Sequence, residues 1–381
     1  MDFEFSGDQR AWQEAAIEFA RRELCRDVVA RDREGRFDRE AWRRCAEFGV
    51  LGMPVPKEYG GLGLKLSEIL AAMEGLGYGG RDAGLLFSLN AQLWSAAIPL
   101  VHFGTDEQKR RWLPGLCDGT LIAANGASEP DSGSDVFALR TRATKLGDRY
   151  VLDGTKTFVT NAPVADLIVA YATIDPAQGA LGVTAFLVER GAKGVTITRE
   201  IDKMGLRTSP MAEVVLSDVE VPAAGRLGRE GRGVEVFEHS MEFERGSILA
   251  TSLGVMRRQL ERCVDHARTR RQFGQPIGKF QSVANRLVDM KLRLETCRPL
   301  VYGIGALKDA GKDATTEAAL AKLHVSDCFV KSGLDAVQLF GGYGYTTEYE
   351  LERELRDAVG SLLYSGTSDI QRNLVARGLG L

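Results

Sequence analysis

The stretch YVLDGTKTFVTN, residues 150–161, decides the class of fold. It holds two short runs of β-branched, aromatic and aliphatic residues around Asp153 and Gly154, a composition typical of β-strands. Further runs of this kind follow at residues 167–171, 183–188 and 214–216. Strand patterns are therefore gathered in the middle of the chain, where they predict an antiparallel β-domain.

Helical patterns lie on both sides of these strands, and Ser6 stands at a capping position before the first of them. Helices are expected within residues 5–24, 67–76, 85–103 and 106–113 before the strands, and within 235–267, 283–308 and 315–339 after them. The glycine-rich segment Gly225–Gly233 is expected to be a linker. Because the strands are segregated from the helices, this order argues against a doubly wound parallel sheet and for a multidomain α+β fold.

The length and the charge of the chain limit how it can be organised and which classes of partner it can have. A chain of 381 residues exceeds what one hydrophobic core usually serves, so several packed units are expected. The 49 basic and 52 acidic residues are interspersed and leave a net charge of −3, which predicts no nucleic-acid partner. No apolar stretch approaches the ~20 residues of a membrane span, and Met1–Glu4 lack the pattern of a signal peptide. We therefore expect a cytoplasmic protein without a membrane partner.

The cysteines predict neither a disulfide framework nor a metal site. The six of them, Cys25, Cys45, Cys117, Cys263, Cys297 and Cys328, are scattered, without a Cys-x-x-Cys pair and without a histidine at ligand spacing. Buried free thiols in a reducing cytosol are the simplest interpretation. With only four histidines in the chain, no metal is expected.

Four motifs, taken in order, point to one family. They are ASEPDSGSD (127–135), KTFVTN (156–161), RRQFGQPIG (270–278) and QLFGGYGY (338–345). Together they resemble the acyl-CoA dehydrogenases, and the last motif, continued through Glu348, Arg353 and Asp357, fits a family signature without a mismatch. Ala127 and Phe158 stand where a larger aliphatic residue and tryptophan are commoner. The resemblance implies an N-terminal α-helical domain (1–120), a middle antiparallel β-barrel (121–230) and a C-terminal four-helix bundle (231–381).

A narrower likeness concerns the substrate. The segments LIAAN (121–125), TNAPVAD (160–166), QSVANR (281–286) and SGTSDIQ (365–371) are similar to a branch of secondary metabolism. That branch oxidises prolyl groups held on peptidyl carrier proteins to pyrrolyl groups. The likeness implies an acyl or aminoacyl thioester substrate, on a carrier protein or on coenzyme A.

The catalytic base is displaced from its usual place. In most of the family a glutamate precedes Gly-Thr-Ser and removes the α-proton of the thioester, whereas this chain has Ser365, whose hydroxyl is too weak a base. Glu244 lies in an apolar helical stripe between Met241 and Ile248, where burial is expected to raise its pKa. In the isovaleryl-CoA dehydrogenase branch the base lies on this helix before an arginine, as Glu244 precedes Arg245. The alternative is a structural acid paired with an arginine.

The resemblance also implies an FAD site and a thioester site. Predicted FAD contacts are Ser128, Ser134, Phe158, Thr160, Gln338, Gly341, Gly342, Thr367 and Asp369, with Arg270 and Phe273 reaching the FAD of a neighbouring subunit. Predicted substrate contacts are Ser134, Glu242 and Arg245 along the pantetheine arm, and Tyr364 at the acyl pocket, together with residues near Leu86–Leu93. The competing interpretations are an ordinary core strand at Phe158, a solvated basic run at Arg270, a glycine-rich turn at Gly341 and a helix cap at Thr367.

The leading hypothesis is an FAD-dependent α,β-dehydrogenase in which Glu244 removes the α-proton and flavin N5 accepts the β-hydride. Two alternatives stay open. One is a flavin oxidase on the same fold, and the other is a catalytically silent relative that binds a thioester or carrier protein. The electron acceptor is an electron-transferring flavoprotein or oxygen, and the shared FAD site implies at least a dimer, with a homotetramer usual in the family.

Overall fold

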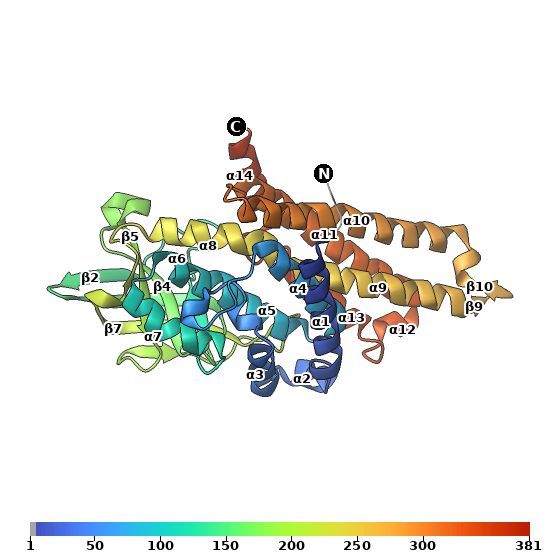
Figure 1. The fold of residues 1–381 in the computed structure, drawn as a ribbon, viewed down its shortest axis with the longest axis horizontal. Coiled ribbons are helices and arrows are strands. Elements are labelled where there is room, and N and C mark those ends of the chain that lie inside the picture. The colour runs from blue at the N-terminus through green and yellow to red at the C-terminus, as the bar shows by residue number, and fades with distance from the viewer. Residues whose placement is uncertain (1–4) are drawn as a thin grey trace.

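The computed structural model describes residues 5–381, in the order helices, strands, helices. The first helical part contains α1 (Gly7–Glu23), α2 (Val28–Glu34), α3 (Arg39–Glu47), α4 (Leu66–Gly79), α5 (Ala83–Gln92), the π-helical η3 (Leu93–Ala97), α6 (Ile98–Phe103) and α7 (Asp106–Cys117), with 3-10 turns at Val50–Gly52 and Lys57–Tyr59. The β-domain lies at one end of an elongated molecule (Figure 1). Residues 1–4, whose sequence lacks a signal-peptide pattern, lie outside the described residues.

Local chemistry explains where the first helix begins. The Ser6 hydroxyl accepts a hydrogen bond from the Gln9 N–H at 3.2 Å, and the Gln9 side chain accepts one from the Ser6 N–H at 2.8 Å. This reciprocal pair satisfies two backbone donors that have no partner within the helix. The capping position predicted for Ser6 is confirmed.

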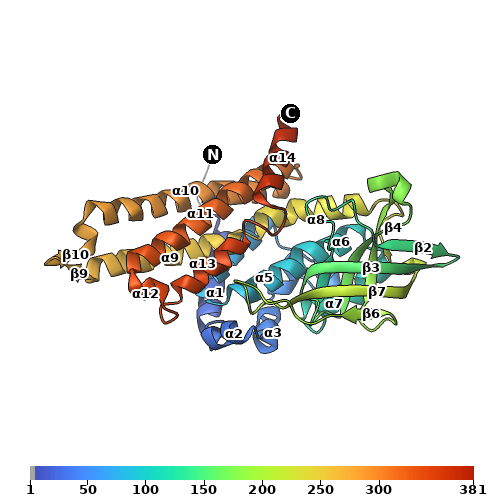
Figure 2. The ribbon, with the colours of Figure 1, turned by 180° about the vertical axis from the view of Figure 1, so that it is seen from behind.

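The middle of the chain forms an eight-stranded sheet in the path β6-β7-β3-β2-β4-β5-β8, with β1 beside β4. Its strands are β1 (Ala123–Gly126), β2 (Arg142–Leu146), β3 (Arg149–Thr160), β4 (Leu167–Thr173), β5 (Val183–Glu189), β6 (Val195–Ile197), β7 (Met211–Pro222) and β8 (Arg226–Leu227). The two predicted runs within residues 150–161 join into the single strand β3, and a register shift marks their junction. Figure 2 shows β3 and β7 side by side.

Two expectations for this domain are corrected. The sheet is mixed, because β1 and β2 both pair with β4 in parallel, while the remaining ladders are antiparallel. The expected linker Gly225–Gly233 contains β8, whose Arg226 and Leu227 pair with β5. Closure of the sheet into a barrel stays a prediction.

The second helical part contains α8 (Gly233–Ser247), α9 (Ala250–Thr269), α10 (Gln281–Asp309), α11 (Thr315–Phe340), α12 (Gly342–Tyr345), α13 (Leu351–Gly360) and α14 (Ser368–Gly378). The short strands β9 (Arg271–Gln272) and β10 (Gln275–Pro276) make a hairpin between α9 and α10. The helix expected over 235–267 is divided by a turn at Ile248–Leu249, whereas the two later helices match their expected ranges closely. The four-helix bundle and the domain limits stay predictions.

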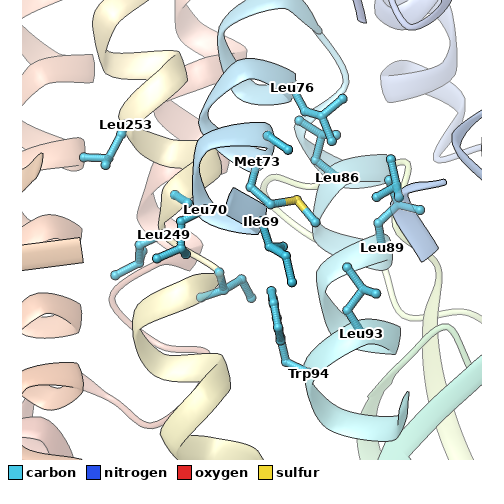
Figure 3. Packing of buried hydrophobic residues seen from close by; sticks show 14 of the residues in the cluster. Ile69, Leu70, Met73, Leu76, Leu86, Leu89, Leu93, Trp94, Leu249 and Leu253 are labelled. Atoms are coloured by element: carbon cyan, nitrogen blue, oxygen red, sulfur yellow. The ribbon is translucent and has the colours of Figure 1, made fainter. Parts of the chain in front are cut away.

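The two helical parts share one core. Ile69, Leu70 and Met73 of α4 lie between Leu89 and Leu93 on one side and Leu249 and Leu253 on the other (Figure 3). All of these side chains are fully buried or nearly so. Burial of apolar surface on this scale is the main favourable term in folding, so the helices before and after the strands are held as one body.

One prediction about apolar stretches was wrong. The continuous helix Ala83–Phe103 is long and apolar enough to cross a membrane, and it is the one such helix in the described residues. In the structure 83% of its apolar window is buried within the protein. Its hydrophobicity is explained by two cores, because Leu85 to Trp94 pack in the core shared by the helical parts, while Ala96, Ala97 and Leu100 pack with residues of the β-domain.

Candidate active site

The carboxyl group of Glu244 is buried between two serine hydroxyls. Glu244 lies near the end of α8 and is 8% exposed. Its Oε1 accepts a hydrogen bond from the Ser365 hydroxyl at 2.5 Å, and its Oε2 accepts one from the Ser95 hydroxyl. Burial raises the pKa of Glu244, and the hydrogen bonds from Ser365 and Ser95 oppose that rise because they stabilise the charged form.

The two hydroxyls come from unusual backbone. Ser95 lies in the π-helical turn Leu93–Ala97, a kind of bulge that is frequent at functional sites. Ser365 has a left-handed backbone with φ of 57°, which is uncommon for a residue other than glycine. The side-chain amide of Gln371 fixes this turn by donating to the Ser365 and Gly366 carbonyls at 3.0 and 2.8 Å. Ser365, which stands where most of the family has its base, thus contacts the carboxyl group that is predicted to replace that base.

Cations and aromatic rings complete the surroundings of the carboxyl group. Arg245 is buried beside Glu244, and burial lowers the pKa of its guanidinium. Burial lowers the pKa of Lys322 on α11 to about 8, while the charge of Glu244 acts in the opposite direction. Tyr364 packs against Phe87, with ring centroids 4.7 Å apart, which brings the predicted pocket residues of α5 and the C-terminal segment together. The carboxyl group of Glu244 therefore lies where three other parts of the chain come together: the π-helical turn with Ser95, the segment with Ser365, and α11 with Lys322.

Three of the predicted FAD contacts lie around strand β3. Phe158 is 64% exposed, although its neighbours Thr157 and Val159 are buried, and it has a positive φ of 55°. A register shift against β7 between Lys156 and Val159 turns this ring outward. The Ser128 carbonyl accepts a hydrogen bond from the Thr157 N–H at 2.9 Å, so Ser128 lies beside the same strand. An exposed aromatic ring on a bulged strand argues against the ordinary core strand that is the competing interpretation.

A second group of predicted contacts lies at the other end of the helices. The β9–β10 hairpin is at the end of the molecule opposite the β-domain (Figures 1 and 2), and its Phe273 is 94% exposed. The Arg270 guanidinium lies 5.8 Å from the ring of Tyr343. Within one chain the structure therefore brings Arg270 close to the glycine-rich segment after α11, and leaves Phe273 free to contact another molecule.

The glycine-rich segment borders an open hollow of about 800 Å³. Gln338, Gly341 and Gly342 line it, together with Arg293 and Tyr345. Gly341 has φ of 61° and ψ of −134°, a backbone conformation open almost only to glycine. An added Cβ at Gly341 or Gly342 would meet open space. Backbone strain at Gly341, rather than crowding, therefore explains the glycine there.

The remaining predicted residues have local partners. The Thr367 hydroxyl caps α14 by accepting a hydrogen bond from the Ile370 N–H at 3.3 Å, and Asp369 pairs with Arg372 at 2.9 Å. Glu242 pairs with Lys308 at 2.9 Å and accepts a hydrogen bond from the Ala314 N–H at 2.9 Å. Ser134 is exposed. Their roles toward FAD or substrate stay predictions, and Thr367 also fulfils the competing interpretation of a helix cap.

Two residues of the site were missed by the sequence analysis. Ser95 is a polar residue within the apolar run 93–100, and Lys322 is a lysine within an apolar helical pattern. Each breaks its pattern, and that break is the signal that could have found it. One expectation is also corrected: His324 does have cysteines near it, since ligand atoms of Cys297, His324 and Cys328 lie within 4.8 Å of one another. The six cysteines are free thiols, as expected.

Comparison with protein families assigns the chain. Models of the N-terminal, middle and C-terminal domains of acyl-CoA dehydrogenases match residues 6–120, 124–219 and 231–380. The chain therefore belongs to the acyl-CoA dehydrogenase family, with its three-domain fold of helices, strands and helices. The predicted family is confirmed, and with it the predicted class, an FAD-dependent oxidoreductase that acts on CH–CH groups.

Particular relatives narrow the comparison. The chain is 42% identical to an L-prolyl-[peptidyl-carrier protein] dehydrogenase of a Serratia species, over 100% of this chain and 99% of that protein. It is 48% identical, with a TM-score of 0.98, to the prolyl acyl carrier protein oxidase AnaB, over 99% of this chain and 100% of AnaB. The structure of PigA with FAD and proline matches at 42% identity and a TM-score of 0.98, with both chains fully covered.

Proposed function

We propose that this protein removes two hydrogens from the α- and β-carbons of a prolyl or related aminoacyl thioester on a carrier protein, with Glu244 as the base. The observation that carries the proposal is the buried Glu244 carboxyl between the hydroxyls of Ser95 and Ser365. Full-length similarity to prolyl carrier-protein dehydrogenases supports the substrate class. A coenzyme A thioester has the same pantetheine arm and is the alternative substrate.

The residues around β3 and after α11 fit FAD. The outward ring of Phe158 offers an apolar face for a flat ring system. Thr160 lies on the same strand, and Ser128 lies in the segment after β1 that hydrogen-bonds to that strand at Thr157. The hollow beside Gln338, Gly341 and Gly342 offers backbone that a phosphate or adenosine can approach closely. Thr367 and Asp369 lie at the start of α14, where an anion is favoured. FAD, when bound, supplies the acceptor for the hydride that leaves the β-carbon.

Glu244 carries the proton chemistry. The α-hydrogen of a thioester leaves as a proton to the carboxylate, and the electron pair of that C–H bond becomes the new double bond as the β-hydrogen leaves as a hydride. A base works best when its pKa lies near the working pH, and burial moves Glu244 in that direction. Ser95 and Ser365 hold both oxygens in place. Arg245 and Ser134 are assigned to the pantetheine arm, and Tyr364 with Phe87 to the acyl pocket.

The proposed assembly is a homotetramer. Each subunit has three domains, which span residues 1–120, 121–230 and 231–381. Large apolar side chains are exposed on α10 and α11, namely Val288, Leu292, Leu320 and Leu334. An interface between subunits along these two helices would remove these side chains from water. Exposed Phe273, with Arg270 beside it in the chain, would then reach the FAD of a neighbouring subunit.

A second candidate is an oxidase on the same fold. AnaB, whose structure is the one with 48% identity, is described as a prolyl acyl carrier protein oxidase. The proton chemistry at Glu244 would be unchanged, and the two candidates differ only in whether oxygen or an electron-transferring flavoprotein takes the electrons.

The test is anaerobic mixing of the FAD-loaded protein with an L-prolyl carrier-protein thioester, while the visible absorption of the flavin is followed. The proposal expects bleaching by the unaltered protein, none by Glu244→Gln, and a dehydrogenated prolyl product by mass spectrometry. L-prolyl-coenzyme A is the matched substrate, and faster bleaching by it would favour the alternative thioester.

Each other result has a meaning. Bleaching by Glu244→Gln at the unaltered rate would remove Glu244 from the role of base. No bleaching by either protein, with FAD bound, would favour a silent relative. Rapid recovery of colour in air, with peroxide formed, identifies the oxidase.

A further inference from the structure

Lys322 is a buried lysine without a hydrogen-bond partner. It lies on α11, its side chain is 0% exposed, and its Nζ has no partner among residues 5–381. Buried polar groups are nearly always hydrogen-bonded, and an isolated buried ammonium is costly. A buried lysine without a hydrogen bond lowers the stability of the fold. Its presence is therefore better explained by a role in function than by a role in folding.

The groups around Lys322 belong to the Glu244 site. Glu244 and Arg245 of α8 both act electrostatically on its ammonium, and its Nζ lies 5.8 Å from the ring centre of Tyr364. Arg245 and Lys322 are the cations that face Glu244, and Tyr171 of β4 and Tyr364 are the other titratable groups near it. Burial raises the pKa of both tyrosines, so they stay neutral and the local charges are one carboxylate and two cations.

We propose that Lys322 is a positioning residue that acts through Glu244, keeping its carboxylate ionised in the resting enzyme and thus ready to accept the α-proton. The expected change in flavin reduction rests on the proposed function. The expected change in the ionisation of Glu244 does not, because it can be measured without substrate.

Electrostatics gives the physical reason. Burial favours the neutral acid, and two neutral hydroxyl donors offset that preference only in part. A cation in a water-poor site is felt more strongly than the same cation in water. When the α-proton arrives, the attraction between Glu244 and Lys322 is lost. The ammonium therefore also limits how basic the carboxylate becomes, and sets the pH above which the site works.

The variant to make is Lys322→Met, with Lys322→Arg as the conservative replacement and Lys145→Met as the control. Methionine fills nearly the same space without a charge, and Lys145 is an exposed lysine of β2, paired with Glu230 and outside the proposed FAD and substrate sites. The first measurement is an infrared pH titration of the carboxylic-acid band of Glu244 in the FAD-loaded protein without substrate, with Glu244→Gln identifying the band. We expect Lys322→Met to move this titration upward by about one pH unit, about tenfold in the ionisation equilibrium.

The second measurement is the pH profile of flavin reduction by the prolyl thioester. The acid limb should move upward in Lys322→Met, with KM little changed, and return toward its normal place in Lys322→Arg. Thermal unfolding should show Lys322→Met about as stable as the unaltered protein, since the lost attraction to Glu244 is offset by removal of a buried ammonium that makes no hydrogen bond among the described residues. Lys145→Met should leave the infrared titration and the acid limb unmoved.

Two results would overturn the proposal. One is an unmoved Glu244 titration in Lys322→Met. The other is a large loss of stability in Lys322→Met with an unmoved acid limb, which would make Lys322 a structural residue only. If the infrared titration moves but no protein variant is ever reduced by a thioester, the link between Lys322 and Glu244 stands and the proposed function falls.

Discussion

Glu129 and Glu244 are both buried glutamates, yet their surroundings lead to opposite behaviour. Glu129, 6% exposed, lies in the β-domain, where Lys156 pairs with it at 2.7 Å. It also accepts hydrogen bonds from Thr141 Oγ1 and from the N–H groups of Arg140 and Thr141. Burial pushes the pKa of Glu129 upward, but Lys156 and these donors outweigh it and leave the pKa below its ordinary value. Glu244 has two hydroxyl partners, no direct ion pair within residues 5–381, and a raised pKa.

The difference teaches that burial alone does not mark a catalytic acid. A glutamate whose acceptor sites are filled by a cation and backbone donors has no reason to take up a proton, and it serves as a structural anchor. A glutamate with fewer and neutral partners is left able to exchange one. The number and charge of the partners separate the two roles.

The largest expected effect is in the Glu244 site. Glu244→Gln should slow flavin reduction by about 10³-fold, within the range for loss of a general base, as stopped-flow absorbance would measure. Its stability should not fall. Because the folded-state pKa of Glu244 is raised, the unaltered protein loses stability as pH rises from the ordinary glutamate pKa of 4.5 through the raised pKa, and the glutamine variant escapes that loss. Thermal unfolding at pH 5 and pH 8 tests the sign of this difference.

The counterpart in the β-domain should show the reverse pattern. Lys156→Met leaves the Glu129 charge buried without its cation and should cost about 3 kcal/mol of unfolding free energy, measured by urea titration. The double variant Glu129→Gln/Lys156→Met should recover part of that loss, because no uncompensated charge remains. A Lys156→Met protein of unaltered stability would show that the ion pair is not what anchors this segment.

A smaller effect is expected from the two hydroxyls. Ser95→Ala and Ser365→Ala each remove a donor that stabilises the ionised form of Glu244, so its pKa should rise and the acid limb of the rate profile should move to higher pH. Above that limb, Ser365→Ala should retain most activity, and the loss at lower pH should be about tenfold or less for a shift of about one unit. The rate of flavin reduction against pH is the measurement. An acid limb that moves downward in either variant would reverse the sign of this argument.

The smallest effect concerns Thr367, whose two interpretations are still to be separated. Thr367→Ala removes the α14 cap and should cost about 1 kcal/mol of unfolding free energy, whereas Thr367→Ser should keep most of it. FAD affinity, measured by fluorescence titration, is the second readout. A cap that does not touch FAD would leave that affinity unchanged, and a shared role would weaken it together with stability.

Much of the fold could be predicted from the sequence, because period and composition are local properties. The helix expected over 315–339 and the one observed, Thr315–Phe340, nearly coincide. The strand β8 was missed because two residues carry no readable alternation, and the parallel pairing of β1 with β4 depends on a crossover that no local pattern encodes. The break between α8 and α9 could not be predicted, because the helical spacing of apolar residues continues through the turn at Ile248–Leu249.

The sequence points to a candidate site residue wherever a single residue departs from its local pattern. Glu244 stands out because a carboxylate interrupts an apolar stripe, and Ser365 because a base is absent from its motif. Ser95, which contacts Glu244, and Lys322, which acts on it electrostatically, lie on helices 149 and 78 positions away in sequence, and only tertiary packing brings them near it. A serine in an apolar helix has many ordinary explanations, so the role of Ser95 becomes apparent only from its hydrogen bond to Glu244 in the structure.

Because of the π-helical turn Leu93–Ala97, the insertion or deletion of one residue would change which side chains of this helix face the Glu244 site. A π-turn holds one residue more than the α-helix around it, and each residue of an α-helix advances by about 100°. Deleting one residue there would restore a regular helix and rotate everything on one side of the turn relative to the other, carrying Ser95 away from Glu244. Insertions and deletions at this turn therefore offer evolution a way to present new side chains to a bound acyl group while the surrounding core, already packed, keeps its helices in place.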